Sequence, residues 1–239
     1  MWKNLVFGLM IAGFSLGQSI SCKADILLSW NTAGNLGTET SEPSVTNDAN
    51  LAAANLTLGA GVVASTNGNR FGGSNWFDTG NTAAGSTIAE AVAGNNFIQF
   101  VVTPSGATFS ATSLDFIWDR SGTGPSSVAL RSSIDGFATD LGTVTGMISG
   151  GNATTTLRSI AISGVNDIST STTFRLYGFG STAVGGTGGF DTATGATTPN
   201  VVFNGTITAV PEPTSIVLLS LAGSSGLVVN YRRRKSRRV

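Results

Sequence analysis

The chain of 239 residues contains no histidine and only one cysteine, Cys22. Histidine is the commonest general base and the commonest zinc ligand, so its absence excludes Ser-His-Asp and Cys-His nucleophile systems. Cys22 lies in a segment that we expect to be removed, which leaves the rest of the chain without a disulfide or a reactive thiol. The largest classes of hydrolase and thiol enzyme are therefore excluded.

Lysine is absent from residues 25–209, which hold five arginines against twelve acidic residues, a net charge of −7. An acidic domain offers no basic patch for phosphates, so we predict no nucleic-acid partner. The formal charge of the whole chain is nevertheless zero, because the two ends are basic. The basic cluster at the C-terminal end consists of Arg232, Arg233, Arg234, Lys235, Arg237 and Arg238.

Residues 1–24 have the pattern of a signal peptide. Lys3 precedes an apolar run at 5–16, which has the length of a signal-peptide core and is too short to span a bilayer. Cys22-Lys23-Ala24 places small residues at the −3 and −1 positions, so we expect cleavage after Ala24. The alternatives are an uncleaved anchor and a lipidated Cys22.

The last thirty residues, 210–239, combine three elements in a fixed order. Val210-Pro211-Glu212-Pro213 is followed by an apolar run at 216–231 and then by the basic cluster. The run predicts a short transmembrane helix of about 24 Å, against a hydrocarbon core of about 30 Å. Arginines stay on the cytoplasmic side of a membrane, so residues 25–209 are predicted to lie on the opposite side, as an exported domain.

This order of a Pro-Glu-Pro motif, an apolar run and terminal arginines resembles the PEP-CTERM sorting signal of exosortase-bearing Gram-negative bacteria. One departure is Ser224-Ser225, which interrupts a stretch that is usually more apolar. The resemblance implies cleavage near the Pro-Glu-Pro motif by a membrane-embedded exosortase, followed by release to, or attachment at, the cell surface. A permanent tail anchor is the alternative.

Residues 25–209 show short apolar runs separated by turns rich in Gly, Asn, Ser and Thr, a pattern typical of all-β domains. In one run Leu114, Phe116 and Trp118 alternate with Asp115 and Asp119, which places the two sets on opposite faces of a strand. We predict an antiparallel two-sheet β-sandwich, jelly-roll-like, with one short helix within 82–93 capped near Ser86. The predicted strands are 26–30, 55–63, 97–103, 113–118, 127–132, 156–162, 172–179 and 201–208.

Two stretches, 131–137 (RSSIDGF) and 174–180 (FRLYGFG), are similar to a recurring β-sandwich ectodomain of PEP-CTERM surface proteins. That ectodomain is itself similar in outline to jelly-roll carbohydrate-binding modules. The resemblance implies a surface location and a sandwich fold, and it carries no assigned activity.

Exposed aromatic side chains would bind sugars by stacking on their apolar faces. Trp76 lies in a loop rich in glycine and asparagine, and Tyr177 points outward beside Arg175, so these three are the candidate ligand-binding residues. A buried position for Trp76 remains an alternative. Trp30 and Trp118 share parity with aliphatic neighbours and are expected in the core.

Carboxylate pairs are the acid–base machinery that remains without histidine. Asp115 and Asp119 are about 13 Å apart along a strand, which exceeds the roughly 6–10 Å of an inverting glycosidase pair. Asp135-Gly136 is typical of a turn. We therefore predict no catalytic residue and no enzymatic activity.

No cofactor is predicted, and no metal ligand is assigned. Asp78 with Asn81, or Asp191 with Asn200, would supply oxygen ligands for a structural calcium ion, although the sequence has no Asp-x-Asp-x-Asp-Gly loop.

Together these observations predict an exported cell-surface or extracellular-matrix protein with a structural or adhesive role. The alternatives are a carbohydrate-binding module that recognises an extracellular polysaccharide and a carboxylate-based glycoside hydrolase. The implied partners are the export machinery, an exosortase, the membrane before processing and an extracellular polysaccharide.

Overall fold

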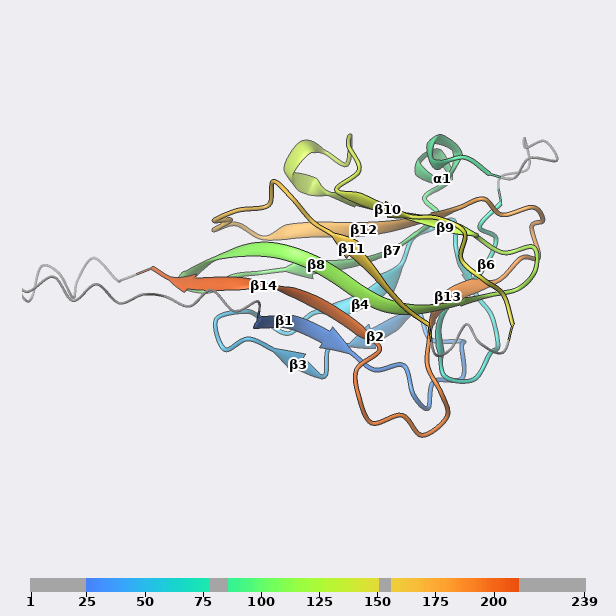
Figure 1. Cartoon of the computed structure of the whole chain (residues 1–239), viewed down its shortest axis with the longest axis horizontal. Helices are drawn as coiled ribbons and strands as arrows, with labels where there is room; N and C mark the ends of the chain where they lie inside the picture. Colours follow the sequence, from blue (N-terminus) through green and yellow to red (C-terminus); the bar gives the residue numbers. More distant parts are fainter. Residues whose placement is uncertain (1–24, 78–85, 151–155, 211–239) are drawn as a thin grey trace, which may run out of the picture.

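The computed structural model describes residues 25–77, 86–150 and 156–210 as two antiparallel sheets packed face to face (Figure 1). The predicted signal peptide, Pro211 to Pro213, the apolar run at 216–231 and the basic cluster lie outside the described residues. Within the described ranges no helix is long and apolar enough to cross a membrane.

The larger sheet has eight strands in the order β3-β1-β14-β8-β13-β6-β5, with β11 paired to β8 off this path. Its strands are β1 (Asp25–Trp30), β3 (Thr46–Asn47), β5 (Val63–Ala64), β6 (Arg70–Ser74), β8 (Ala107–Arg120), β11 (Leu157–Ala161), β13 (Gly188–Asp191) and β14 (Val201–Ala209).

The smaller sheet has six strands in the order β10-β9-β12-β7-β4-β2. Its strands are β2 (Ser41–Pro43), β4 (Asn55–Leu58), β7 (Phe97–Val102), β9 (Ser127–Ser132), β10 (Gly142–Val144) and β12 (Thr172–Phe179). A helix, α1 (Ile88–Gly94), and a 3-10 turn, η1 (Ser133–Asp135), complete the described elements.

The predicted antiparallel two-sheet β-sandwich is confirmed, and each of the predicted strands overlaps an observed one. β8 is longer than predicted, beginning at Ala107 rather than at 113. The prediction missed β6 and β13 because their sequences, RFGGS and GGFD, contain adjacent glycines, which weaken a strand pattern. It also missed the short strands β2, β3, β5 and β10.

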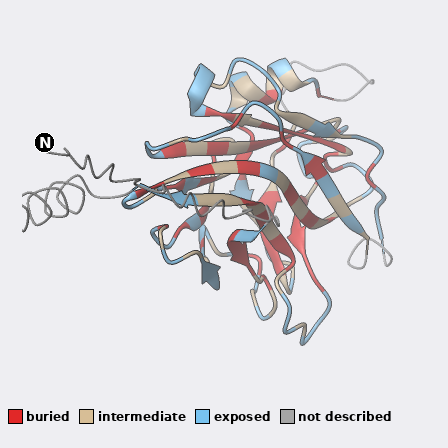
Figure 2. Cartoon of the chain, turned by 60° about the vertical axis from the view of Figure 1, so that its left-hand side comes forward, coloured by how far each residue is buried: buried red, intermediate tan, exposed pale blue. Residues whose placement is uncertain are grey.

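The alternation along β8 is confirmed. Leu114, Phe116 and Trp118 are buried, whereas Asp115 and Asp119 are partly exposed. The buried face belongs to the core between the sheets, where aromatic rings from both sheets meet. Figure 2 shows in red the buried residues along the strands of both sheets. The ring pairs include Trp30 with Phe100, Phe100 with Phe174, Phe174 with Phe203, and Trp118 with Phe190. Each such buried side chain contributes about 1.5–3 kcal/mol through removal of apolar surface from water.

The predicted helix within 82–93 is observed at Ile88–Gly94, and its N-cap is Thr87 rather than Ser86. The Thr87 hydroxyl accepts from the Glu90 backbone N–H, and the Glu90 carboxylate accepts from the Thr87 backbone N–H, which is a capping box. The helix ends at Asn95 in the left-handed conformation. α1 lies on the outer face of β12 and buries Ala91 beside Tyr177.

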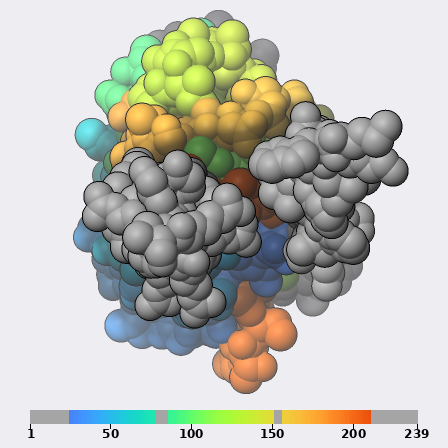
Figure 3. Space-filling view, turned by 90° about the vertical axis from the view of Figure 1, so that its left-hand side faces the viewer, coloured from blue at the N-terminus to red at the C-terminus, as the bar shows by residue number. Residues whose placement is uncertain are grey.

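Strand pairing gives the sandwich two distinct ends. Asp25 pairs with Gly205 and Ala209 pairs with Ala107, so β1 begins, β8 begins and β14 finishes at one end, which we call the terminal pole. Figure 3 views the molecule from this side. β8 then runs about 40 Å to Asp119 at the opposite end, the distal pole, where β6 and β13 lie (Figure 1).

Candidate functional site

Trp76 does not form the predicted surface platform, because its side chain is fully buried. The indole N–H donates to the Gly73 carbonyl oxygen at 2.8 Å, and the ring lies edge-on to Trp118. The ring also packs on Gly178, where an added Cβ would lie 2.5 Å from the indole. Trp76 is therefore a core residue that depends on a glycine of β12.

Tyr177 is also buried. The prediction that its side chain is exposed for ligand binding is therefore wrong. Its side chain does point away from the main core, as its parity in β12 predicts, but α1 covers that face. The Tyr177 ring lies edge-on to Phe97, with centroids 5.3 Å apart. The missing information was the position of α1, which strand periodicity does not contain.

Arg175, the third candidate, is partly buried between two aromatic rings. Its guanidinium carbon lies 4.3 Å from the Phe97 ring centroid and 4.0 Å from that of Phe137, and its Nε donates to Gln99. Phe137 reaches this position with a positive φ of 64° after Gly136. The stretches 131–137 and 174–180 thus meet across β9 and β12, in a cation–π cluster that stabilises the surface.

The carboxylates singled out in the sequence are not brought together. Asp115 accepts hydrogen bonds from Ser159 and Asn204, whereas Asp119 forms an ion pair with Arg70. Asp135 accepts from the Thr139 hydroxyl and from two backbone N–H groups, and these bonds lower its pKa. The interpretation of Asp135-Gly136 as a turn is confirmed.

The distal pole instead brings together three charged side chains that the sequence does not place side by side. Asp191 of β13 pairs directly with Arg70 of β6, and Asp119 of β8 pairs with Gly189, two residues before Asp191. Their neighbours Phe71, Trp118 and Phe190 are buried in the core. Because successive residues of a strand alternate, Arg70, Asp119 and Asp191 share the outer face of three adjacent strands.

Arg70 is the centre of this cluster and is only 2% exposed. One terminal nitrogen, Nη2, forms the ion pair with Asp119, and Nε lies 3.5 Å from Oδ2 of Asp191. Burial raises the pKa of Asp191 to about 6, against the lowering effect of the Arg70 charge and of a hydrogen bond from the Thr192 backbone N–H. The cluster therefore changes charge in a mildly acidic range.

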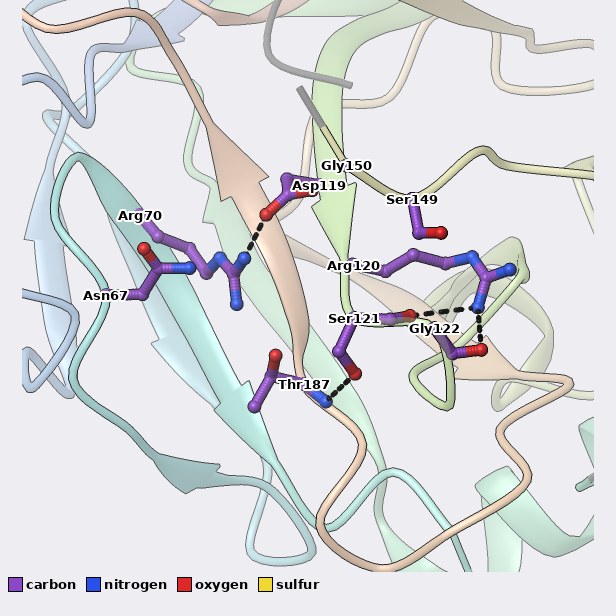
Figure 4. A pocket seen from close by; sticks show the side chains of 9 residues that line it. All are labelled: Asn67, Arg70, Asp119, Arg120, Ser121, Gly122, Ser149, Gly150 and Thr187. Carbon is purple, nitrogen blue, oxygen red and sulfur yellow. Dashed lines mark hydrogen bonds and ion pairs between the residues drawn. The ribbon is translucent and has the colours of Figure 1, made fainter. Parts of the chain in front are cut away.

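A pocket of about 400 Å³ opens over this cluster (Figure 4). It is lined by Asn67, Arg70, Asp119, Arg120, Ser121, Gly122, Ser149, Gly150 and Thr187. A second pocket of about 370 Å³ lies beside it and shares Asn67, Asp119 and Gly150 with the first. Neither lining includes an aromatic residue, so this surface is suited to hydrogen bonding rather than stacking.

Arg120 fixes the rim of the first pocket. Its guanidinium donates to the carbonyl oxygens of Ser121, Gly122, Gly124 and Met147 at 2.8–3.1 Å. These bonds hold the turn after β8 and the segment before Ser149 against each other. Among the described residues Arg120 has no ion pair with a carboxylate.

Two buried nitrogens of Arg70, Nε and Nη1, make no hydrogen bond with any described residue. Nε still lies 3.5 Å from Oδ2 of Asp191, whereas Nη1 has no such partner among the described residues. A buried donor without an acceptor costs about 1–3 kcal/mol, and such groups are few in native proteins. This atom distinguishes the pocket from an ordinary polar surface.

The proposed calcium ligands are engaged elsewhere or lie outside the described residues. The Asn200 side-chain oxygen accepts from the Thr32 backbone N–H, its nitrogen donates to the Asp191 carbonyl oxygen, and the Asp191 carboxylate faces Arg70. Asp78 and Asn81 lie outside the described residues. Within 25–77, 86–150 and 156–210 there is no cluster of three or more acidic, Cys or His side chains suited to a metal ion.

Sequence reasoning missed Arg70 and considered Asp191 only as a calcium ligand with Asn200, although a weak signal for the cluster was present. Each charged residue stands near a glycine pair, Gly72-Gly73 or Gly188-Gly189. Glycine within a strand often marks a close approach of another backbone, and β6 and β13 do approach closely at these glycines.

Comparison of the chain with family models, with curated proteins and with solved structures finds no match.

Proposed function

We propose that this chain is an exported cell-surface or extracellular-matrix protein with a structural or adhesive role, processed by an exosortase at the Pro-Glu-Pro motif. The observation that supports this best is the position of the folded domain between the two predicted processing sites. β1 begins at Asp25, directly after Ala24, and β14 ends at Ala209, directly before Val210. Cleavage at both sites would leave every described strand intact.

The geometry of the two ends also suits a protein that is first tethered and then released or attached. The β1–β14 pairing brings both predicted processing sites to the terminal pole. Val210 is half exposed, so the chain is accessible where the motif begins. The distal pole, at the other end of β8, is then free to face the matrix.

The carbohydrate-binding alternative, in a jelly-roll-like frame, is supported by the distal pocket and no longer by an aromatic platform. The hydrolase alternative is disfavoured, because both oxygens of Asp191 are engaged, by Thr192 and Arg70, and Asp115 is held by its own neighbours. We therefore propose a non-enzymatic protein.

The test is to express the full chain in two matched Gram-negative strains, one with and one without an exosortase, and to measure the mass of the protein in each cell fraction. We expect a mature form that starts near Asp25 and ends near the Pro-Glu-Pro motif only when exosortase is present. Glu212→Ala should block the C-terminal cleavage, whereas the matched change Glu90→Ala should not. A C-terminal tail that is retained in both strains would overturn the proposal.

A further inference from the structure

We propose that the pocket at the distal pole binds a neutral, polyhydroxylated saccharide, with one sugar hydroxyl held between Arg70 and Asp119. This site adds ligand recognition to the proposed surface role. The existence of the site does not depend on exosortase processing.

One ion pair in the pocket contains a donor and an acceptor that are both uncommitted. Nη1 of Arg70 has no hydrogen-bond partner among the described residues, and Asp119 uses Oδ2, but not Oδ1, toward Arg70. Figure 4 shows one terminal nitrogen of Arg70 on Asp119 and the other directed toward the space between Asn67 and Thr187. A hydroxyl group can accept from a guanidinium and donate to a carboxylate at the same time.

Further polar groups surround this pair. The side chains of Asn67, Ser149 and Thr187 line the first pocket, and none of them makes a hydrogen bond to another described side chain or backbone group. An amide and two hydroxyls offer both donors and acceptors. That mixture matches a ligand whose own groups are hydroxyls, each able to play either role.

The charges that line the pockets favour an uncharged ligand. The two pockets are lined by two cations, Arg70 and Arg120, and by two carboxylates, Asp119 and Asp191. The lining is therefore balanced when all four are ionised. A ligand carboxylate placed on Arg70 would approach Asp119, and like charges at such a distance repel. The observations thus favour a neutral sugar over a uronic acid or a phosphate.

The arrangement of the pockets suits an extended ligand. The two pockets, of about 400 and 370 Å³, lie side by side and share Asn67, Asp119 and Gly150. Volumes of this order accommodate small ligands. Two adjoining compartments fit consecutive residues of a saccharide chain better than a single compact molecule.

The experiment uses the full chain, purified in a mild detergent, and an array of oligosaccharides of glucose, galactose and mannose beside matched uronate-containing oligosaccharides. The best neutral probe is then titrated by calorimetry. We expect saturable binding to a neutral probe. Asp119→Asn should weaken it about tenfold or more, and Asn67→Ala and Thr187→Val should each weaken it about threefold to tenfold, as expected for lost hydrogen bonds.

Matched controls are Asn166→Ala and Thr173→Val, which change the same residue types away from the pocket and should leave the affinity unchanged. Asn67 and Thr187 are not core residues, so equal melting temperatures would show that their variants fold. The proposal is overturned if no neutral probe binds saturably, if only uronate probes bind, or if both pocket variants bind like the wild type. Export and C-terminal cleavage are measured separately, so failure of this site is distinguishable from failure of the proposed surface role.

Discussion

The terminal and distal poles belong to the same larger sheet and are built differently. At the terminal pole β14 runs beside β8 over nine paired residues, with β1 on its other side. At the distal pole β13 has four residues and β6 has five, and each contains two adjacent glycines. The long ladder carries alternating apolar residues and fixes the shape of the sandwich. The short glycine-rich strands allow close backbone approach and gather charged side chains at the proposed site.

The largest expected effect comes from adding one methyl group at the distal pole. In Gly189→Ala the new Cβ would lie 2.5 Å from the Phe71 carbonyl oxygen and 2.8 Å from the Gly72 Cα, both of them backbone atoms. We expect a loss of about 4 kcal/mol or more, seen as a melting temperature roughly 10 °C lower in circular dichroism. Gly185→Ala, whose Cβ would meet no atom within 4 Å, is the control. Equal melting temperatures would show that β13 is not held tightly against β6.

The second effect separates buried from exposed ion pairs. Arg70→Met leaves Asp119 and Asp191 without their cation, and we expect a loss of about 3 kcal/mol in urea unfolding, because an uncompensated buried charge is costly. Arg131→Met removes the pair with Asp140, whose side chain is 36% exposed, and should cost about 1 kcal/mol or less. Similar losses in the two variants would mean that the ion pairs of Arg70 contribute no more to the free energy of unfolding than an exposed ion pair does.

The third effect is a pH dependence confined to the distal pole. The pKa of Asp191 is raised to about 6 by burial, so between about pH 4 and 6 the folded protein binds more protons than the unfolded chain. Its contribution to stability is therefore fully present below about pH 4 and is lost as the pH rises through 6. Asp191→Asn should reduce the stability lost between about pH 4 and 6 by about 1 kcal/mol, after allowance for solvent screening.

Melting temperatures of wild type and Asp191→Asn at half-unit steps from pH 4 to 7 provide the measurement. Burial also raises the pKa of Glu42, which is present in both proteins and cancels in the difference. Parallel curves would contradict the prediction.

The smallest effect concerns the helix that covers Tyr177. Thr87→Ala removes the hydroxyl that caps α1 and should cost about 0.5–1 kcal/mol, measured by urea unfolding. Thr87→Ser keeps a capping hydroxyl and should restore most of that loss. No difference between the two variants would mean that packing on Tyr177, rather than the cap, holds the helix in place.

The strands that could be predicted from the sequence are those in which apolar and polar residues alternate. Residues 114–118 of β8 and 174–176 of β12 carry large apolar residues at every second position, so these strands and their buried faces follow from the sequence alone. The alternation of β8 is out of step between Ala111 and Leu114, and the part before 113 was not predicted. β6 and β13 lack this alternation, because glycine pairs replace the side chains that would mark a face. The pocket depends on their register against β8, which is a relation among three distant segments.

The two aromatic candidates, Trp76 and Tyr177, also show that burial depends on contacts between distant segments. Trp76 is buried because Gly178, far along the chain, leaves space for its indole ring. Tyr177 has the predicted orientation, but a helix from another segment covers it. Local composition indicated exposure for Trp76, and strand parity indicated it for Tyr177. Neither pattern contains the tertiary contact that decides burial.

The pairing of β14 also has a mechanical consequence. If the chain is held through its C-terminal end while a ligand is held at the distal pole, the load runs along β14 and β8. Hydrogen bonds between antiparallel strands lie perpendicular to the strands, so such a pull shears the whole ladder at once instead of opening it one bond at a time. With β1 on its other flank, β14 would resist extraction from both sides, which is consistent with the surface role proposed above.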